Sequence, residues 1–137
     1  MSALAEQDRV AVEEIRRTLD GVVAVYRFGS SVSGTAHRQS DVDLAVLGQG
    51  RLAATTRFDL QERLAVRLGR NVDLVDLGSA STVMAMQVIG HGTLLFEGDP
   101  LQRGAFEDRT YSGYARLNEE RREILERIAA EGTVYGG

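Results

Sequence analysis

The fold of this chain is decided by residues 28–46, which read FGSSVSGTAHRQSDVDLAV. The stretch opens with a Gly-Ser pair and closes with an Asp-Val-Asp triplet that leads into a short apolar run. Another apolar run, residues 21–28, leads into it. Apolar runs bounded by small and polar residues are typical of buried strands, so the pattern predicts two strands joined by a loop of small residues.

The two aspartates of the triplet predict a cation site. Side chains on a strand alternate between its faces, so Asp41 and Asp43 project from the same face. Val42 and Leu44 are then buried on the opposite face. Two ionised carboxylates so close together repel each other unless a cation lies between them, and Mg2+ binds carboxylates together with substrate phosphates. We therefore expect Asp41 and Asp43 to bind a divalent metal.

The Gly-Ser pair predicts an anion site. Gly29 permits a tight turn and a close approach of the backbone, and Ser30 offers a hydroxyl and an N–H group. A helix that begins near Ser30 would add free N–H groups, which bind anions. An anion site beside metal-binding carboxylates suits a nucleoside triphosphate. The alternative is a Gly/Ser-rich turn before a strand with solvent-facing aspartates, and each half of the motif alone would favour it.

Composition limits the possible functions. The chain holds 137 residues, 43% of them apolar, as expected for a single domain over residues 1–137. It contains no cysteine and no lysine, which excludes disulfides, thiol chemistry and a lysine nucleophile. No segment resembles a signal peptide or a membrane span of roughly 18 apolar residues, so we expect a cytoplasmic protein without a membrane partner. The net charge of −4 argues against direct binding to nucleic acid.

The complete motif resembles the signature of the polymerase-β-like nucleotidyltransferases. It consists of a strand, Gly29-Ser30, ten intervening residues and Asp41-Val42-Asp43 at the start of another strand. The resemblance implies an α/β (α+β) fold with a small mixed sheet, helices packed on it and a long C-terminal helix. Hydrophobic periodicity predicts helices over 3–19, 52–68, 79–89 and 101–130, and strands over 21–28, 41–47, 70–77 and 93–96.

A third carboxylate comes from the strand predicted over residues 70–77. An aspartate inside such an apolar strand is costly unless it is paired or bound to a metal. We therefore expect Asp73 to be the third metal ligand and a catalytic residue. The alternative is that Asp73 or Asp76 only lies at the strand end and caps the next helix, and we assign that structural role to Asp76.

Two further blocks extend the resemblance to the minimal nucleotidyltransferase (MNT) antitoxins. They are VDLVDL at residues 72–77 and GHGTLLFEGDP at residues 90–100, and the similarity runs from about residue 21 to residue 128. The resemblance implies an ATP-dependent adenylyltransferase that places AMP on a tyrosine of its cognate HEPN-domain ribonuclease toxin. It also implies a stable hetero-oligomer with that toxin.

The mechanism expected for such a site is in-line nucleotidyl transfer from ATP with two Mg2+ ions. Asp41 and Asp43 would bridge both ions. Asp73 would bind one ion and help to deprotonate the incoming tyrosine. Gly29 and Ser30 would hold the phosphates of ATP.

One residue departs from the family pattern. Many members carry an arginine just before the second glycine of the loop, where this chain has Ser33. If that arginine holds the triphosphate, one contact is lost here, and Arg27 or Arg38 could replace it. Two other functions therefore stay open: an antitoxin that only masks its toxin, and a small-molecule nucleotidyltransferase. The latter is disfavoured because such enzymes usually carry a further domain for the acceptor.

Overall fold

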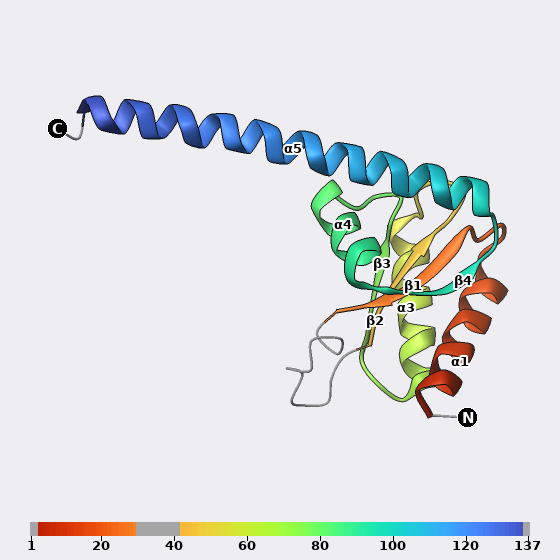
Figure 1. The fold of residues 1–137 in the computed structure, drawn as a ribbon. Coiled ribbons are helices and arrows are strands. Elements are labelled where there is room, and N and C mark those ends of the chain that lie inside the picture. The colour runs from red at the N-terminus through yellow and green to blue at the C-terminus, as the bar shows by residue number, and fades with distance from the viewer. Residues whose placement is uncertain (1–2, 30–41, 136–137) are drawn as a thin grey trace.

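The computed structural model describes residues 3–29 and 42–135. The described elements agree in type and order with the predicted ones (Figure 1). They are α1 (Ala3–Thr18), β1 (Ala24–Phe28), β2 (Val42–Leu47), α3 (Ala54–Leu68), β3 (Val72–Asp76), α4 (Thr82–His91), β4 (Thr93–Glu97) and α5 (Pro100–Tyr135).

The four strands form one mixed sheet, as predicted, and their order is β3-β2-β1-β4. Strand β1 is antiparallel to both β2 and β4, and β2 is parallel to β3. The register places Asp43 of β2 opposite Phe28 of β1 on one side and opposite Asp73 of β3 on the other. The order of the strands thus decides which ends of β1, β2 and β3 lie together.

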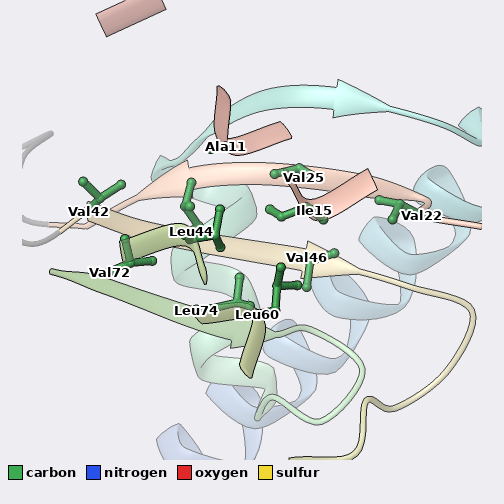
Figure 2. Packing of buried hydrophobic residues seen from close by; sticks show 11 residues of the cluster. Ala11, Ile15, Val22, Val25, Val42, Leu44, Val46, Leu60, Val72 and Leu74 are labelled. Atoms are coloured by element: carbon green, nitrogen blue, oxygen red, sulfur yellow. The ribbon is translucent and has the colours of Figure 1, made fainter. Parts of the chain in front are cut away.

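Helices α1 and α3 cover one face of the sheet. Their apolar side chains pack with every second residue of the strands, as Figure 2 shows. This core contains Ala11, Ile15, Val22, Val25, Val42, Leu44, Val46, Leu60, Leu64, Val72 and Leu74. Val42 and Leu44 are therefore buried on one face, as the alternation along the strand predicted.

Helix α4 and the first turns of α5 cover the other face. The second core contains Val23, Ala24, Tyr26, Phe28, Ala45, Leu47, Leu77, Ala85 and Val88, with Phe106 of α5 packed against it. The Tyr26 hydroxyl donates a hydrogen bond to Glu107 Oε2 at 2.7 Å, and Arg103 Nη1 lies 2.6 Å from the same oxygen. Burial, and to a smaller extent the hydrogen bond to Glu107, raises the pKa of Tyr26 above its ordinary value. The network fastens the start of α5 to β1.

Strand β3 lies at the edge of the sheet, yet part of its outer backbone is capped by α3. The Leu74 N–H donates to Gln61 Oε1 at 2.8 Å, and Arg57 Nη1 donates to the Leu74 carbonyl at 3.1 Å. Arg57 Nη1 also lies 3.1 Å from Gln61 Oε1, so the two side chains support each other. The backbone of Leu74 is thereby satisfied without a further strand.

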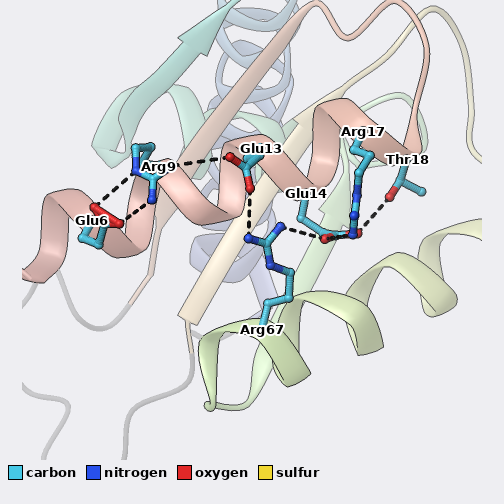
Figure 3. A network of polar contacts seen from close by, with 7 residues as sticks. All are labelled: Glu6, Arg9, Glu13, Glu14, Arg17, Thr18 and Arg67. Carbon is cyan, nitrogen blue, oxygen red and sulfur yellow. Dashed lines mark hydrogen bonds and ion pairs between the residues drawn. The ribbon is translucent and has the colours of Figure 1, made fainter.

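A buried carboxylate joins α1 to α3. The side chain of Glu14 is fully buried, and its Oε1 lies 2.6 Å from Arg17 Nη2 and 3.0 Å from Arg67 Nη1 (Figure 3). Thr18 Oγ1 donates to the other carboxylate oxygen at 3.2 Å. Burial alone raises the pKa of Glu14, but hydrogen bonds from Arg67 and Arg17 outweigh it and hold the pKa below 4.5.

We expect Glu14→Gln to lower the free energy of unfolding by about 2 kcal/mol at pH 7, because two arginines lose their shared anion at a buried position. Glu13→Gln is the matched control: Glu13 also pairs with Arg67, at 2.9 Å, but its side chain is 52% exposed. This control should lose about 0.5 kcal/mol or less. Urea unfolding of the three proteins measures both values.

The pH dependence of this difference follows from the lowered pKa. A carboxyl group with a lower pKa in the folded protein stabilises the fold above its unfolded pKa. That contribution is lost as the pH falls through the folded pKa. The gap between wild type and Glu14→Gln should therefore shrink below about pH 4.5, the ordinary value. A gap that stays constant down to pH 2 would contradict the ionised state of Glu14.

Candidate active site

The sheet brings two of the predicted acidic residues together at one end. Asp43 is the second residue of β2, Asp73 is the second residue of β3, and the two are paired in the parallel register. Neighbouring strands are about 4.8 Å apart. The residues on either side of each aspartate are buried in the core under α1 and α3, so both carboxylates project from the other face. Asp41 and Ser30, which complete the predicted site, lie outside the described residues.

Gly29 follows directly after β1 and lies against Asp43. It has φ +102, and a Cβ atom built on it would lie 1.9 Å from Asp43 Oδ2. A side chain at this position would collide with the carboxylate. The close approach expected at Gly29 is therefore present, and the group that approaches its backbone in this structure is Asp43.

The two aspartates of β3 have different surroundings. Asp76 is buried and accepts hydrogen bonds from Leu52 N–H at 2.9 Å, Gly78 N–H at 3.0 Å and Ser79 Oγ at 2.7 Å. It lies at the strand end, as predicted, and organises the loops there, but the helix that follows is capped by Ser81 rather than by Asp76. Asp73 is exposed and makes no hydrogen bond or ion pair with the described part of the chain. Its carboxylate is thus accessible to a ligand.

Arg27 is committed to the opposite face of the sheet. Its Nε lies 3.0 Å from Asp8 Oδ1 on α1, and both side chains are mostly buried. Asp43 projects from the face covered by α4. Arg27 therefore lies on the wrong face to replace the family's loop arginine, whose place is taken by Ser33 in this chain. Arg38, the other candidate, lies outside the described residues.

The sequence predicts a turn at Gly-His-Gly, residues 90–92, and gives His91 no role. The structure corrects this: Gly90 and His91 are the last residues of α4, and Gly92 after them lies beside the site. A Cβ atom built on Gly92 would lie 2.9 Å from the Arg27 carbonyl oxygen and 3.2 Å from Phe28 Cβ. The end of α4 therefore packs against the end of β1 that leads into Gly29. Gly92 was the available signal, because close packing against backbone requires a small residue.

The donor set of the site fits a divalent metal. Within residues 3–29 and 42–135, no group of three Asp, Glu or His side chains gathers to bind a metal, and the predicted third member, Asp41, is not among them. Asp43 and Asp73 supply carboxylate oxygens from adjacent strands, the ligand type that hard cations such as Mg2+ prefer. Neither position offers a soft sulfur ligand.

A hollow of about 360 Å3 lies elsewhere, at the opposite ends of β2 and β3. It is lined in part by Leu47, Leu77 and Arg109. Leu47 ends β2, whereas Asp43 lies near its start, so this hollow is distant from the paired aspartates. The chemistry of the paired carboxylates, rather than the volume of the hollow, defines the candidate site.

A mixed sheet with paired aspartates beside a Gly turn is the arrangement of a polymerase-β-type nucleotidyltransferase. A family model described as "Polymerase beta, Nucleotidyltransferase" matches residues 11–101. The protein adenylyltransferase MntA of Shewanella oneidensis is 39% identical over 119 residues, which cover 87% of this chain and 85% of MntA. This chain therefore belongs to the polymerase-β nucleotidyltransferase family, in the branch of the MNT antitoxins that includes MntA.

Solved structures agree with this assignment. A toxin–antitoxin crystal structure with AMP-PNP matches with a TM-score of 0.78 and 37% identity, over 88% of this chain and 97% of that chain. A structure of the tri-AMPylated HEPN toxin of Shewanella oneidensis in complex with its MNT antitoxin matches with a TM-score of 0.75 and 32% identity, over 90% and 96% of the two chains. Within the described residues, no helix has the length and apolar character needed to cross a bilayer.

Proposed function

We propose that this chain is an antitoxin that neutralises a cognate HEPN ribonuclease toxin by Mg2+-dependent transfer of AMP from ATP to a tyrosine of that toxin. The observation that carries the proposal is the paired register of Asp43 and Asp73 on one face of the sheet, with Gly29 against Asp43. MntA, a protein adenylyltransferase by name, supports the choice of a protein as acceptor. We place the reaction in the cytoplasm, without membrane or direct nucleic-acid contacts.

The residues that would hold two Mg2+ ions are Asp41, Asp43 and Asp73. When bound, the metal would neutralise the charge of the triphosphate and align the reacting oxygens. Asp43 is suited to this task because β1 and β3 flank its strand on both sides, which fixes its backbone. Asp73 lies on the edge strand, where its exposed carboxylate can also face an incoming protein.

The chain's own groups would act on the two substrates as follows. The backbone of Gly29 and the hydroxyl of Ser30 would hold the β- and γ-phosphates of ATP. The carboxylate of Asp73 would accept the proton of the acceptor tyrosine Oη, whose ordinary pKa is near 10. The bond from Oη to the α-phosphorus forms as the bond to the bridging oxygen of the β-phosphate breaks, and pyrophosphate leaves. Most of the acceleration would come from positioning and charge stabilisation.

A second function, masking of the toxin without transfer, is favoured by one observation. Ser33 replaces the usual loop arginine, and Arg27 is held by Asp8 on the other face of the sheet. A weaker hold on the triphosphate would leave binding as the means of neutralisation. A small-molecule acceptor is a third candidate, and it predicts no association with a toxin.

The test is to incubate the purified chain with the HEPN protein from the neighbouring gene, ATP and Mg2+, and to measure the mass of that protein. We expect a gain of one or more AMP units, which disappears with the double substitution Asp41→Ala/Asp43→Ala. A complex without a mass gain would favour masking. The absence of any complex would favour the small-molecule acceptor and contradict both antitoxin functions.

A further inference from the structure

Helix α5 extends far beyond the body of the protein (Figure 1). Its first turns are fastened to the sheet through Phe106 and Glu107. Further along the helix, Gly113 lies against the start of α4, where an added Cβ atom would lie 3.4 Å from Thr82 Cγ2. The residues that follow, 114–135, span about 33 Å at 1.5 Å per residue. Over most of its length, the projecting part of α5 therefore has no support from residues 3–29 and 42–113.

The projecting part carries an apolar stripe on one side. The stripe consists of Leu117, Arg121, Ile124, Leu125 and Ile128, spaced as one helical face. Its four apolar side chains are 43 to 57% exposed. Hydrophobic periodicity in the sequence predicts an apolar seam of Tyr114, Leu117, Ile124 and Ile128. Tyr114 is partly buried, but no described element covers the other three. Exposed apolar patches of this kind mark interaction sites in soluble proteins.

The charges around the stripe restrict its partner. Arg122 and Glu119 lie on the opposite side of the helix and pair with each other at 2.6 Å. Arg121 stands within the stripe and makes no ion pair with any residue in the described ranges. Two copies packed in parallel through this stripe would place Arg121 against Arg121. A partner with a carboxylate at that point fits better, because a desolvated cation needs a counter-charge.

The shape of the stripe also indicates the kind of partner. Leu117, Arg121, Ile124 and Ile128 alone would form the narrow seam of a two-helix coiled coil. Leu125 adds one more apolar position beside this seam and so widens the stripe. A wider stripe of this kind is typical of a helix that packs into the groove between two other helices. The stripe thus suits the surface of a helical bundle.

Helix α4 connects the stripe to the candidate active site. Its first residue, Thr82, lies against Gly113, where α5 leaves the body, and Gly92 at its end lies against Phe28. The ten residues of α4 span about 15 Å. Val83 and Met84 are exposed on this helix, 52% and 38% respectively. A protein bound along the stripe and α4 therefore reaches the end of the sheet that carries the aspartates.

We infer that the α5 stripe and the exposed side of α4 dock the protein substrate of the site, the cognate HEPN toxin, as a helical partner with an acidic side chain opposite Arg121. This inference rests on the proposed function, because it takes the acceptor to be a protein. Docking there brings the acceptor tyrosine to Asp43 and Asp73 and raises its local concentration at the site.

The test introduces negative charges into the apolar stripe. Ile124→Glu/Ile128→Glu is compared with Ala115→Glu/Ala130→Glu, which adds the same charge on the opposite side of the helix. All four residues are exposed, so thermal unfolding should be unchanged. We expect the stripe variant to bind the toxin about 30-fold more weakly, the range of an interface hot spot. Its KM for toxin should rise while kcat at saturating toxin and the affinity for AMP-PNP with Mg2+ stay as in wild type.

A milder variant keeps the test informative if the double substitution harms the helix. Arg121→Glu should weaken toxin binding by about tenfold. Unchanged toxin affinity in both stripe variants would overturn the inference. So would a wild-type dimer that the stripe variant converts to a monomer with full toxin affinity, which would assign the stripe to a second copy. If wild type binds toxin through the stripe but transfers no AMP, the proposed transfer fails and the docking surface stands.

Discussion

Asp43→Asn should abolish AMP transfer to the toxin, with a loss of about 1000-fold or more, while toxin binding stays at the wild-type level. Asparagine has nearly the same shape as aspartate, so the fold of β2 is kept and only the negative charge is removed. That charge is what a divalent cation requires at this position. The rate of AMP incorporation, followed by the intact mass of the toxin, measures the effect, and calorimetry of the complex measures binding.

The charge-matched control for this variant is Asp59→Asn, which removes a carboxylate from the exposed side of α3. It should label the toxin at the wild-type rate. Asp41→Asn should behave like Asp43→Asn, because the two residues are proposed to bind the same metals. Labelling by Asp43→Asn at more than a tenth of the wild-type rate would remove Asp43 from the proposed metal site.

Gly29→Ala should give the second large effect, about a 100-fold loss of transfer with a drop in stability of about 1–3 kcal/mol. Two causes act together at this position. The φ of +102 is unfavourable for alanine, and the added Cβ atom would meet the Asp43 carboxylate at 1.9 Å. The carboxylate must move aside, and a displacement of about 1 Å at a reacting group is enough for such a loss.

Gly69→Ala separates the two causes. Gly69 ends α3 with φ +64 and has no atom within 4 Å of an added Cβ. Alanine there should cost about 1–2 kcal/mol of stability through the left-handed backbone alone and leave transfer unchanged. Urea unfolding and the labelling assay compare the two variants. Equal transfer rates in Gly29→Ala and wild type would show that the position of Asp43 against Gly29 does not matter for the reaction.

The elements of the fold could be predicted from hydrophobic periodicity, but several boundaries depend on contacts that no local pattern contains. Strand β1 begins at Ala24 rather than at Gly21, and the φ of +65 at Gly21 lies outside the range of a strand. Helix α4 begins at Thr82 rather than at residue 79. Ser79 instead binds Asp76, and Ser81 caps the helix by accepting a hydrogen bond from Met84 N–H at 3.1 Å.

The candidate site was predictable in part. The alternation of strand residues correctly predicted the face of Asp43. The cost of burying a carboxylate in an apolar strand singled out Asp73, but the structure leaves Asp73 exposed and buries Asp76 instead, so the metal-binding role of Asp73 stays a prediction. That β2 and β3 are neighbours was not visible in periodicity and came only from the resemblance to a family. The commitment of Arg27 to Asp8 could not be foreseen either, because it depends on how α1 crosses the sheet.

The capping of Leu74 by Gln61 and Arg57 bears on how this chain behaves before it meets a partner. An uncovered outer strand invites other molecules to add strands to it, which leads to fibres and precipitates. Here both main-chain groups of Leu74 are already occupied at this outer border. A freshly synthesised copy is thus protected at high concentration from polymerising through the outer edge of β3. Partners are then recognised by its helices.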